Sequence, residues 1–340
     1  MEILLFFPML ISLLVTFLLM PIWIKKARRM GLLWEDMNKN KEEKVAGSGG
    51  IIVVLGFILG IMFYIFLKTF YFKSPINVVE IFALMTSILI LAGTGVIDDL
   101  LGWHRGGLSK KFRLIMCIVA SIPLVVINAG NSSVSIPFLD GTALGLIYPL
   151  IIIPLAVVGT ATTFNFLAGF NGLEAGQGII ILTALSFVAY FTGNTWLGLI
   201  GLCMVFSLIG FWIFNKFPAK VFPGDVLTYP VGGLIALMAI LGNFEKVAVF
   251  FFAVYIAEVL LKARGGLKKQ SFGKPNKDGS LEMPYNKIYG MEHFAIWVLK
   301  KVKNKVYEKD VVWFIWTIQI AVVILGFIIF KESIFKNLVF

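Results

Sequence analysis

Charged residues are scarce in this chain. Asp, Glu, Lys and Arg together make up 14% of its 340 residues, whereas 59% are hydrophobic and the mean hydropathy is +0.91. Soluble domains carry about 25% charged residues, so the composition excludes a soluble globular protein. The short alternating segments that build a membrane barrel are also missing. In their place are continuous apolar runs of about 16 to 22 residues, long enough for a helix to cross a bilayer.

Cysteine is nearly absent as well. Cys117 and Cys203 are the only two, and both lie within apolar runs, which argues against a disulfide or a cysteine metal site. The N-terminal segment has no basic stretch followed by a small-residue cleavage site. We therefore expect the first apolar run to be retained as a membrane span rather than removed as a signal peptide.

The apolar runs predict an all-α, polytopic membrane protein with about ten transmembrane helices. A single transmembrane domain is expected to cover residues 1–340. A cytosolic insertion at 263–310 lies within it, between the ninth and tenth helices. The predicted spans are 3–24, 50–67, 77–97, 113–128, 146–166, 178–193, 196–214, 226–242, 246–262 and 311–330.

The distribution of basic residues predicts the orientation of the chain. Loops that follow odd-numbered spans contain 25 of the 30 Lys and Arg residues. Because Lys and Arg accumulate in cytoplasmic loops, both termini are expected outside and the large loops inside. The net charge of +11 then requires no nucleic-acid partner, since membrane lipids are the expected neighbours of a basic cytosolic surface.

Two adjacent carboxylates end the third apolar run. The segment Leu84–Asp99 is long enough to enter the bilayer and finishes with Asp98 and Asp99. A carboxylate at the centre of a span costs roughly 2.5 to 3.5 kcal/mol, so both should lie at the cytosolic mouth of the bundle. Ser109 is a suitable N-cap for the next helix, which would place the cations of 110–113 near these acids.

Polar residues also follow the fifth span and precede the eighth. Asn165, Asn171 and Glu174 lie in N-F-L-A-G-F-N-G-L-E-A-G-Q, where glycines allow close backbone approach to a ligand and amides can read its hydrogen-bonding edges. Asp225 follows Gly224 in V-F-P-G-D. It is explained either as a helix N-cap or as a carboxylate presented to the cytosolic cavity.

Other segments leave alternatives open. The loop 25–50 is either a solvated connector or a substrate-contacting turn. Glu258 either belongs to the cavity or pairs with a neighbouring lysine. The insertion predicts a β-hairpin around P-N-K-D-G and then an amphipathic helix at the inner membrane interface, with His293 as an interfacial side chain.

This combination of polar groups favours phosphoryl transfer. Carboxylate and amide oxygens are hard ligands suited to Mg²⁺, with Mn²⁺ as the alternative metal. Clustered Lys and Arg residues suit a diphosphate, and phosphoryl transfer depends mainly on positioning and charge neutralisation. An ion-coupled membrane transporter is the second hypothesis, because acids and glycine-interrupted spans also mark transport sites. A lipid-binding scaffold without activity is the third.

The motifs resemble those of the polyprenyl-phosphate N-acetylhexosamine-1-phosphate transferase family. They are G-V-I-D-D-L, N-F-L-A-G-F-N-G-L-E-A-G-Q, V-F-P-G-D-V and S-L-E-M-P-Y-N-K, in this order. The second and fourth make the chain most similar to the eukaryotic and archaeal branch, the UDP-GlcNAc:dolichyl-phosphate GlcNAc-1-phosphate transferases. The resemblance covers nearly the whole chain.

The resemblance implies a reaction between two phosphorylated substrates. A dolichyl or other polyprenyl phosphate would attack the β-phosphorus of UDP-GlcNAc, giving GlcNAc-diphospho-lipid and UMP, as the first membrane step of N-glycan or surface-glycan assembly. The implied setting is an archaeal plasma membrane, or the ER membrane in a eukaryote, with the active site facing the cytosol. A homodimer is the expected form if the chain associates with itself.

The resemblance also implies roles for particular residues. Asn165 and Asp225 would bind the metal, and Asp98 and Asp99 would position or activate the lipid phosphate. The expected substrate-binding residues are Gly169 and Asn171 for uridine, Phe222 for stacking on the base, Glu174, and Lys268, Lys269 and Gln270 for the diphosphate.

The resemblance also implies a cationic residue at the start of the fourth span, and the chain departs from the family pattern in two places. The family's cation at the start of the fourth span matches Arg113, with Lys111 as the alternative. The eukaryotic Arg-His-Arg run for the diphosphate is replaced by 268–270, and Gly47 stands where that enzyme has a carboxylate. A histidine-rich motif of the bacterial cell-wall relatives is absent, which argues against a MurNAc-pentapeptide substrate.

Overall fold

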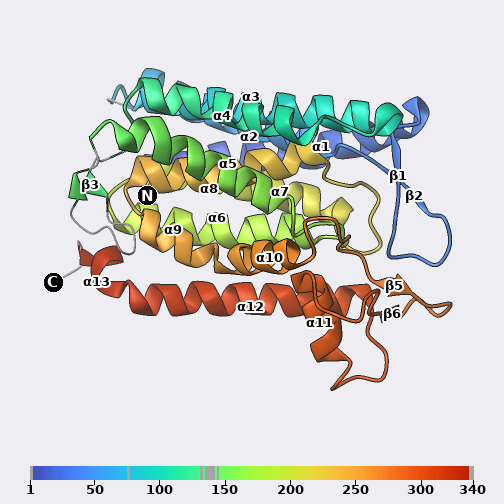
Figure 1. Ribbon diagram of the computed structural model, residues 1–340. Helices are drawn as coiled ribbons and strands as arrows, with labels where there is room; N and C mark the ends of the chain where they lie inside the picture. The colour runs from blue at the N-terminus through green and yellow to red at the C-terminus, as the bar shows by residue number, and fades with distance from the viewer. Residues whose placement is uncertain (1–2, 75–76, 131–132, 135–141, 144, 337–340) are drawn as a thin grey trace.

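The computed structural model of the chain is a bundle of helices with three small hairpins (Figure 1). The structure describes residues 3–74, 77–130, 133–134, 142–143 and 145–336, except for the side chains of 103–105, 133–134 and 142–143. The described elements are η1 (Ile3–Phe6), α1 (Phe7–Met30), β1 (Leu33–Glu35), β2 (Lys44–Ala46), α2 (Gly50–Phe66), η2 (Leu67–Tyr71), α3 (Val78–Arg105), α4 (Lys110–Val126), β3 (Ser133–Val134), β4 (Thr142–Ala143), η3 (Tyr148–Ile152), α5 (Ile153–Phe164), α6 (Leu173–Phe191), α7 (Thr195–Asn215), α8 (Asp225–Gly242), α9 (Glu245–Phe251), α10 (Ala253–Arg264), β5 (Lys274–Pro275), β6 (Leu281–Glu282), α11 (Met291–Leu299), α12 (Glu308–Ile329) and α13 (Lys331–Ile334).

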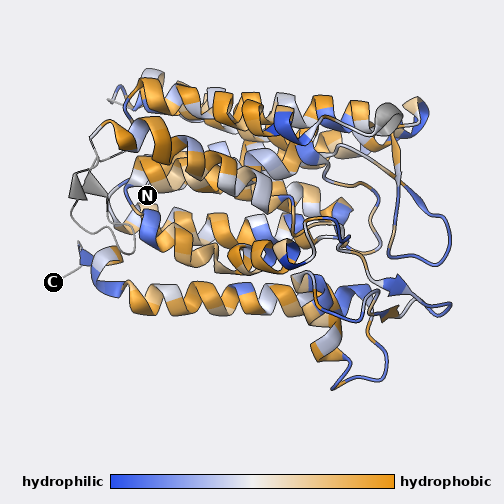
Figure 2. Ribbon diagram, viewed as in Figure 1, coloured by the Kyte–Doolittle hydropathy of each residue, from blue (hydrophilic) through white to orange (hydrophobic). Residues whose placement is uncertain are grey.

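Seven helices in the described part of the chain are long and apolar enough to cross a membrane. Apolar residues cover the helices, whereas polar residues gather in the loops and hairpins at one end of the bundle (Figure 2). The apolar windows of the first and last of these helices are only 28% buried inside the bundle. Leu18 and Ile328, for example, expose 61% and 62% of their surface. Apolar faces of this extent are stable in lipid and not in water, so the protein is an integral, multi-pass membrane protein.

The remaining predicted spans are helical but shorter. The predicted span 113–128 corresponds to α4, and 146–166 corresponds to the apolar helix Tyr148–Phe164. The predicted span 246–262 is divided into α9 and α10 at Phe252, whose backbone N–H still donates to the Ala248 carbonyl. The described residues therefore confirm the all-α polytopic class, with seven helices meeting the full length requirement.

The two ends of the bundle differ in what they carry. The first and last described residues of the chain lie at one end, and β1–β2, β5–β6 and α11 lie at the other, which we call the hairpin end (Figure 1). The hairpin β5–β6 confirms the prediction around P-N-K-D-G, whereas β1–β2, within the loop 25–50, was not predicted. A third pairing joins Ser133–Val134 to Thr142–Ala143.

Helix α8 is the most buried of the seven and positions the site. It packs against α3 and α5, and its first turn lies beside two glycines. A Cβ at Gly95 of α3 would lie 2.4 Å from the Val226 nitrogen, and one at Gly50 would lie 2.5 Å from the Leu227 nitrogen. Larger side chains at these two positions would clash with the α8 backbone, so the glycines allow α2 and α3 to approach its N-terminus closely.

The residues of α11 differ from the prediction in their burial. The predicted helix is present, but the His293 side chain is fully buried, as is that of Glu292. The interpretation of His293 as an interfacial side chain is therefore wrong. The physical reason is that α11 packs against α10 and α12, so its polar residues face other helices rather than the membrane surface.

Candidate active site

Carboxylates and one guanidinium meet where α3, α4, α5 and α8 come together. Asp98 and Asp99 lie near the end of α3, and Arg113 is on the first turn of α4. The Arg113 Nη1 atom lies 3.3 Å from Asp98 Oδ2 and 3.8 Å from Asp225 Oδ2. Asn165, directly after α5, donates its side-chain amide to Asp225 Oδ1 at 2.9 Å. Residues that are far apart in the sequence thus form one polar cluster.

Asp99 and Asp225 are held together by backbone geometry. The Asp225 backbone N–H donates to Asp99 Oδ1 at 2.8 Å, and the Ser48 hydroxyl donates to Asp99 Oδ2 at 2.8 Å. Gly224 precedes Asp225 with φ +72°, and a Cβ there would lie 2.1 Å from Asp99 Oδ2. The N-cap of α8 is therefore Gly224, and the carboxylate of Asp99 satisfies a free N–H at the start of that helix. The Asp225 carboxylate is left for the cluster, which resolves the alternatives for this residue.

The turn between α3 and α4 fixes the other side of the cluster. Asp98 Oδ1 accepts from the Leu108 N–H at 2.5 Å, and Arg113 Nε donates to the Leu108 carbonyl at 3.0 Å. Ser109 caps α4 as predicted, because its hydroxyl accepts from the Phe112 N–H at 3.3 Å. The capped turn brings Arg113 to the two acids.

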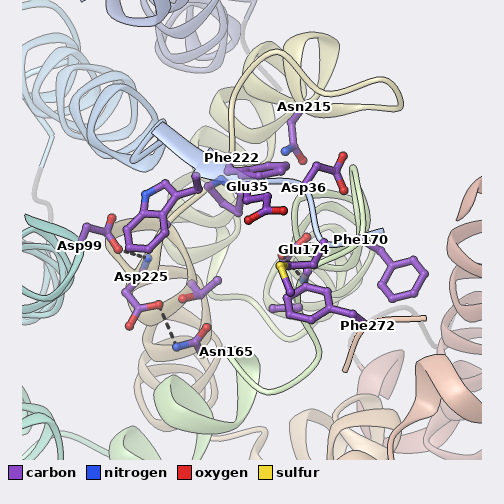
Figure 3. Close-up of a pocket in the computed structure, with 17 residues that line it drawn as sticks. Glu35, Asp36, Asp99, Asn165, Phe170, Glu174, Asn215, Phe222, Asp225 and Phe272 are labelled. Atoms are coloured by element: carbon purple, nitrogen blue, oxygen red, sulfur yellow. Dashed lines mark hydrogen bonds between the residues drawn. The ribbon is translucent and has the colours of Figure 1, made fainter. Parts of the chain in front are cut away.

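Two cavities meet at this cluster. Cavity A, of about 400 Å³, is lined at one end by Asp99, Asn165 and Asp225, and Figure 3 shows Glu174 and Phe272 on its opposite side. Cavity B, of about 290 Å³, lies between α3, α4 and α8. Its lining residues include Asp98, Arg113 and the glycines Gly102, Gly106 and Gly107. The residues that line both cavities are Trp34, Asp99 and Asp225.

Several predicted substrate residues line cavity A. They are Gly169, Glu174 and Phe222. The Gly169 N–H donates to Glu174 Oε1 at 2.8 Å, while Glu174 Oε2 is buried without a hydrogen-bond partner in the described part of the chain. Gly169 has φ +104°, and a Cβ there would lie 2.5 Å from Phe272 Cε1. Glycine at this position therefore allows the Phe272 ring to pack over the loop that follows α5.

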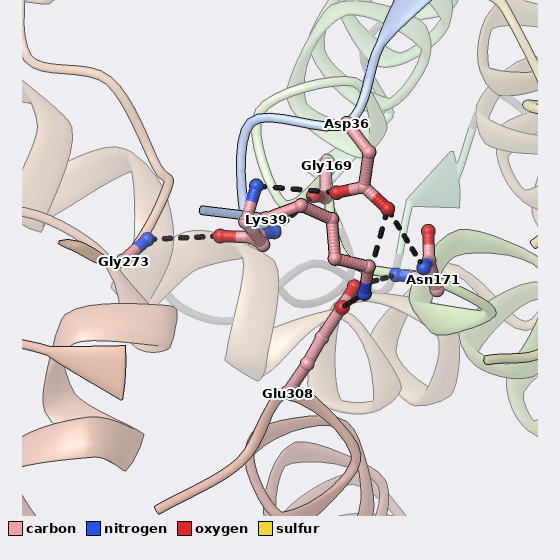
Figure 4. Close-up of polar contacts among 7 residues, drawn as sticks. Asp36, Lys39, Gly169, Asn171, Gly273 and Glu308 are labelled. Atoms are coloured by element: carbon pink, nitrogen blue, oxygen red, sulfur yellow. Dashed lines mark hydrogen bonds and ion pairs between the residues drawn. The ribbon is translucent and has the colours of Figure 1, made fainter. Parts of the chain in front are cut away.

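A buried polar network beside cavity A joins segments from four parts of the chain (Figure 4). Asn171 donates its backbone N–H to Glu308 Oε1 at 2.7 Å and its side-chain amide to Asp36 Oδ2 at 3.1 Å. Lys39 donates to Glu308 Oε2 at 2.7 Å and lies 3.6 Å from Asp36 Oδ2. Asn171, predicted to contact uridine, is thus engaged with Asp36, and it is Asp36 that lines cavity A.

Asn38 extends this network to the insertion. Its side-chain amide donates to the Gly169 carbonyl at 2.7 Å, and its Oδ1 accepts from the Gly273 N–H at 3.1 Å. We call Asp36, Asn38, Lys39, Asn171 and Glu308 the polar clasp. Because Asn38 binds two backbone segments, the clasp fixes the separation between the loop after α5 and the residues beside Phe272.

Comparisons with known proteins identify the family. Residues 81–243 match the model of glycosyl transferase family 4. A Saccharolobus solfataricus protein, provisionally named UDP-N-acetylglucosamine–dolichyl-phosphate N-acetylglucosaminephosphotransferase, is 35% identical over 96% of this chain and 97% of its own length. The chain belongs to glycosyl transferase family 4. It is one of the polyprenyl-phosphate N-acetylhexosamine-1-phosphate transferases of that family.

Other family 4 relatives differ in the substrate that their names state. The Dictyostelium discoideum UDP-N-acetylglucosamine–dolichyl-phosphate N-acetylglucosaminephosphotransferase is 28% identical over 73% of this chain and 68% of its own length. The phospho-N-acetylmuramoyl-pentapeptide-transferase of Staphylococcus saprophyticus is 30% identical over 74% of this chain and 80% of its own length. The two substrates of a family 4 enzyme are a UDP-N-acetylhexosamine and a polyprenyl phosphate.

The donor set of the cluster fits a magnesium ion, on which the family depends. The described residues contain no group of three or more His, Cys, Asp or Glu side chains placed to hold a metal ion by themselves. The cluster instead offers Asn165 and Asp225 beside two further carboxylates, and among the described side chains the cation that faces them is Arg113. Mg²⁺ usually takes only one or two protein ligands and completes its shell with water and substrate phosphates. The excess of carboxylates over cations favours such an ion.

Some predicted residues lie elsewhere. Lys111 is exposed and lines neither cavity, whereas Arg113 belongs to the cluster. Lys268, Lys269 and Gln270 are exposed, and Lys269 Nζ lies 4.8 Å from the centre of the Tyr285 ring. None of these four residues lines either cavity, and their assignments stay predictions. Glu258 pairs with Lys262 at 3.5 Å and accepts from the Met291 N–H, which supports the pairing alternative.

The contribution of β1 and the residues after it to the site was not predicted from the sequence. Trp34, Glu35, Asp36 and Met37 line cavity A, so the loop 25–50 is more than a solvated connector. Other residues not predicted are Asn38, Lys39, Asn215, Phe272 and Glu308. The short run W-E-D-M-N-K mixes acids, an amide and an aromatic residue, and this mixture was the available signal.

Proposed function

We propose that this enzyme transfers GlcNAc-1-phosphate from UDP-GlcNAc to a dolichyl-type polyprenyl phosphate, releasing UMP. The observation that carries the proposal is the meeting of two cavities at Asp99 and Asp225. Transfer requires a nucleotide sugar and a lipid phosphate to be held together, because an oxygen of one must reach the β-phosphorus of the other. This step would begin the assembly of an N-glycan or a surface glycan.

The nucleotide sugar is assigned to cavity A. Phe222 would stack on the uracil ring, and the backbone of Gly169 would lie along the nucleotide. Glu174 Oε2, which is buried and has no hydrogen-bond partner among the described residues, would accept a hydrogen bond from the donor. Lys268, Lys269 and Gln270 would have to move toward the cavity to contact the diphosphate.

The lipid phosphate is assigned to cavity B. Arg113 would attract the phosphate and neutralise part of its charge, and its contacts with Asp98 and Asp225 hold the guanidinium in place. Asp98 and Asp99 would orient the attacking oxygen and accept its proton if it carries one. Asn165 and Asp225 would hold Mg²⁺, or Mn²⁺, which would neutralise charge on the diphosphate.

The choice of GlcNAc rests on sequence. The Saccharolobus solfataricus relative, whose name states dolichyl phosphate and UDP-N-acetylglucosamine, aligns with nearly the whole of this chain. The histidine-rich motif expected of MurNAc-pentapeptide enzymes is absent. An ion-coupled transporter has no comparable support, because Asp98 and Asp99 lie near one end of α3 rather than in its middle.

We also infer that ten helical segments cross the membrane, with the hairpin end in the cytosol. The first and last described residues lie at the same end of the bundle (Figure 1), which requires an even number of crossings between them. The shorter α4, Tyr148–Phe164 and α9–α10 would supply the additional three. With an impermeant thiol reagent on intact cells, Lys73→Cys should be labelled and Asn40→Cys should not. The opposite pattern would reverse the orientation.

The activity is tested with the purified protein and a panel of substrates. UMP release should require Mg²⁺ and dolichyl phosphate, and should be fastest with UDP-GlcNAc among UDP-GlcNAc, UDP-GalNAc and UDP-MurNAc-pentapeptide. Undecaprenyl phosphate serves as the second acceptor. A higher rate with UDP-MurNAc-pentapeptide would refute the GlcNAc assignment, and absence of UMP with every pair would refute the transferase.

A further inference from the structure

One aromatic side chain stands where the two cavities meet. Trp34 lies on β1 and lines both cavity A and cavity B. Among the described residues, only Asp99 and Asp225 share this position, and both belong to the cluster where transfer is proposed. The indole is therefore the one apolar wall that the two cavities have in common in the part of the chain that the structure describes.

Two glycines make room for the indole ring. A Cβ at Gly47 would lie 2.4 Å from Trp34 Cδ1, and a Cβ at Gly102 would lie 3.2 Å from Trp34 Cη2. Because Cδ1 and Cη2 are at opposite ends of the indole, the ring extends from the residues before α2 to the last turns of α3. Trp23 Nε1 donates to the Gly47 carbonyl at 2.9 Å and fixes the backbone beside the indole. The backbone of Trp34 is fixed by pairing with Val45 in β2.

Water is the competing nucleophile in this arrangement. Cavity B is lined by Asp98, Asp99 and Arg113, so it holds water whenever the lipid phosphate is absent. A water oxygen that formed a bond to the β-phosphorus of UDP-GlcNAc would break the bond from that phosphorus to the bridging oxygen. UMP would leave with the electron pair, and the water proton would pass to solvent. The products would be UMP and GlcNAc-1-phosphate rather than the lipid-linked sugar.

Resting on the proposed function, we propose that Trp34 is a specificity-determining residue that favours the lipid phosphate over water. The indole closes the apolar side of the passage between the cavities and leaves open the side formed by Asp99 and Asp225. A phosphate held by Arg113 fills that open side, and with the indole in place no space remains beside it for water to reach the donor. Exclusion of water from a phosphoryl group in transit prevents its hydrolysis.

The test is the partition of one donor between two products. Radiolabelled UDP-GlcNAc is incubated with Mg²⁺ and dolichyl phosphate, and GlcNAc-1-phosphate and lipid-linked GlcNAc are measured together. The ratio of hydrolysis to transfer should rise at least tenfold in Trp34→Ala and less than threefold in Trp34→Phe, which keeps an aromatic wall. Trp313→Ala is the matched control, because Trp313 is 61% exposed on α12 and lines neither cavity. Its ratio should equal that of the parent.

This ratio does not depend on how much of a variant is folded. Trp34→Leu is a second variant for the case in which Trp34→Ala yields no active protein, and its ratio should lie between those of the phenylalanine variant and the alanine variant. A parental ratio in Trp34→Leu or Trp34→Ala, with transfer retained, would overturn the role of Trp34 and leave the transferase standing. Absence of both products from the parent would instead remove the proposed function.

Discussion

At the scale of single residues, the described side chains of the cluster carry more negative than positive charge. Arg113 faces Asp98 and Asp225, while Asp99 is satisfied by a backbone N–H and a hydroxyl. Carboxylates gathered this closely repel one another unless a cation or a proton compensates. A divalent ion and the guanidinium would both reduce this repulsion. Each carboxylate makes a different contact. Asp225 is the one that contacts both Asn165 and Arg113.

We predict that Asp225→Ala abolishes turnover without unfolding the protein. Removing a charged group that acts in the transition state typically lowers kcat by about 10²- to 10³-fold, and a lost metal ligand lowers it further. The measurement is UMP release at saturating substrates, with the thermal midpoint in detergent as a check of folding. Asp278→Ala, on the exposed turn of β5–β6, is the matched control and should keep parental activity. Normal UMP release from Asp225→Ala would exclude this residue from the site.

At the scale of elements, the polar clasp connects loops that secondary structure alone does not connect. Hydrogen bonds from side chains to single backbone groups join four segments: the residues after β1, the loop after α5, the residues beside Phe272 and the first residue of α12. Such polar contacts are worth roughly 1 kcal/mol each when made and cost more when one partner is left buried alone. The shape of cavity A thus depends on a few side chains rather than on helix packing.

Asn38→Ala should weaken donor binding more than it slows the chemical step. The variant leaves the Gly169 carbonyl and the Gly273 N–H without the partner that holds them, so Phe272 loses its fixed place over the cavity. We expect the KM for UDP-GlcNAc to rise about tenfold, equivalent to about 1.4 kcal/mol, with kcat changed less than threefold. The KM for dolichyl phosphate should not change.

Two variants complete this test of the clasp. Asn38→Asp keeps an acceptor for Gly273 but loses the donor to Gly169, so its KM should be intermediate. Asn40→Ala makes the same chemical change at an exposed position of the same loop and should match the parent. Equal donor KM values for the parent and Asn38→Ala would show that the clasp does not shape the cavity.

At the scale of the whole molecule, polar residues are buried away from the site as well as within it. Glu292 and His293 of α11 lie inside, next to Glu258 and Lys262 of α10. Burial lowers the pKa of His293 from 6.5 to about 4. Burial also raises the pKa of Glu292, with the negative charge of Glu258 as a second cause. Folding stability is therefore linked to pH through groups remote from the chemistry.

The His293 contribution has a definite sign. Its pKa is lower in the folded chain, so between pH 6.5 and about 4 the unfolded chain binds the extra proton and stability falls as the pH falls. At pH 5 the loss relative to pH 8 should be about 2 kcal/mol. His293→Gln removes this loss, so its unfolding midpoint in detergent should decline less than that of the parent between pH 8 and pH 5. Glu292 acts in the opposite direction but is present in both proteins. Parallel declines would contradict the prediction.

Much of the fold and part of the site could be predicted from the sequence. Long apolar runs identified the helices, because a span must be apolar along its whole length, and the adjacent Asp98 and Asp99 marked a cavity mouth for the same reason. Ser109 as a cap and the hairpin at P-N-K-D-G follow from local chemistry. The break at Phe252 and the burial of His293 could not be predicted, since both depend on neighbouring helices.

The sequence by itself determined that this protein is a helical membrane protein of a phosphosugar transferase family, because composition and contiguous motifs are local properties of a chain. Only the tertiary structure decided which side chains share a cavity. Arg113 rather than Lys111 meets the acids, Asn171 is engaged with Asp36, and Trp34 lies between two cavities. These contacts join residues far apart in the sequence, and their geometry is set by how closely α2, α3 and α8 pack at glycines.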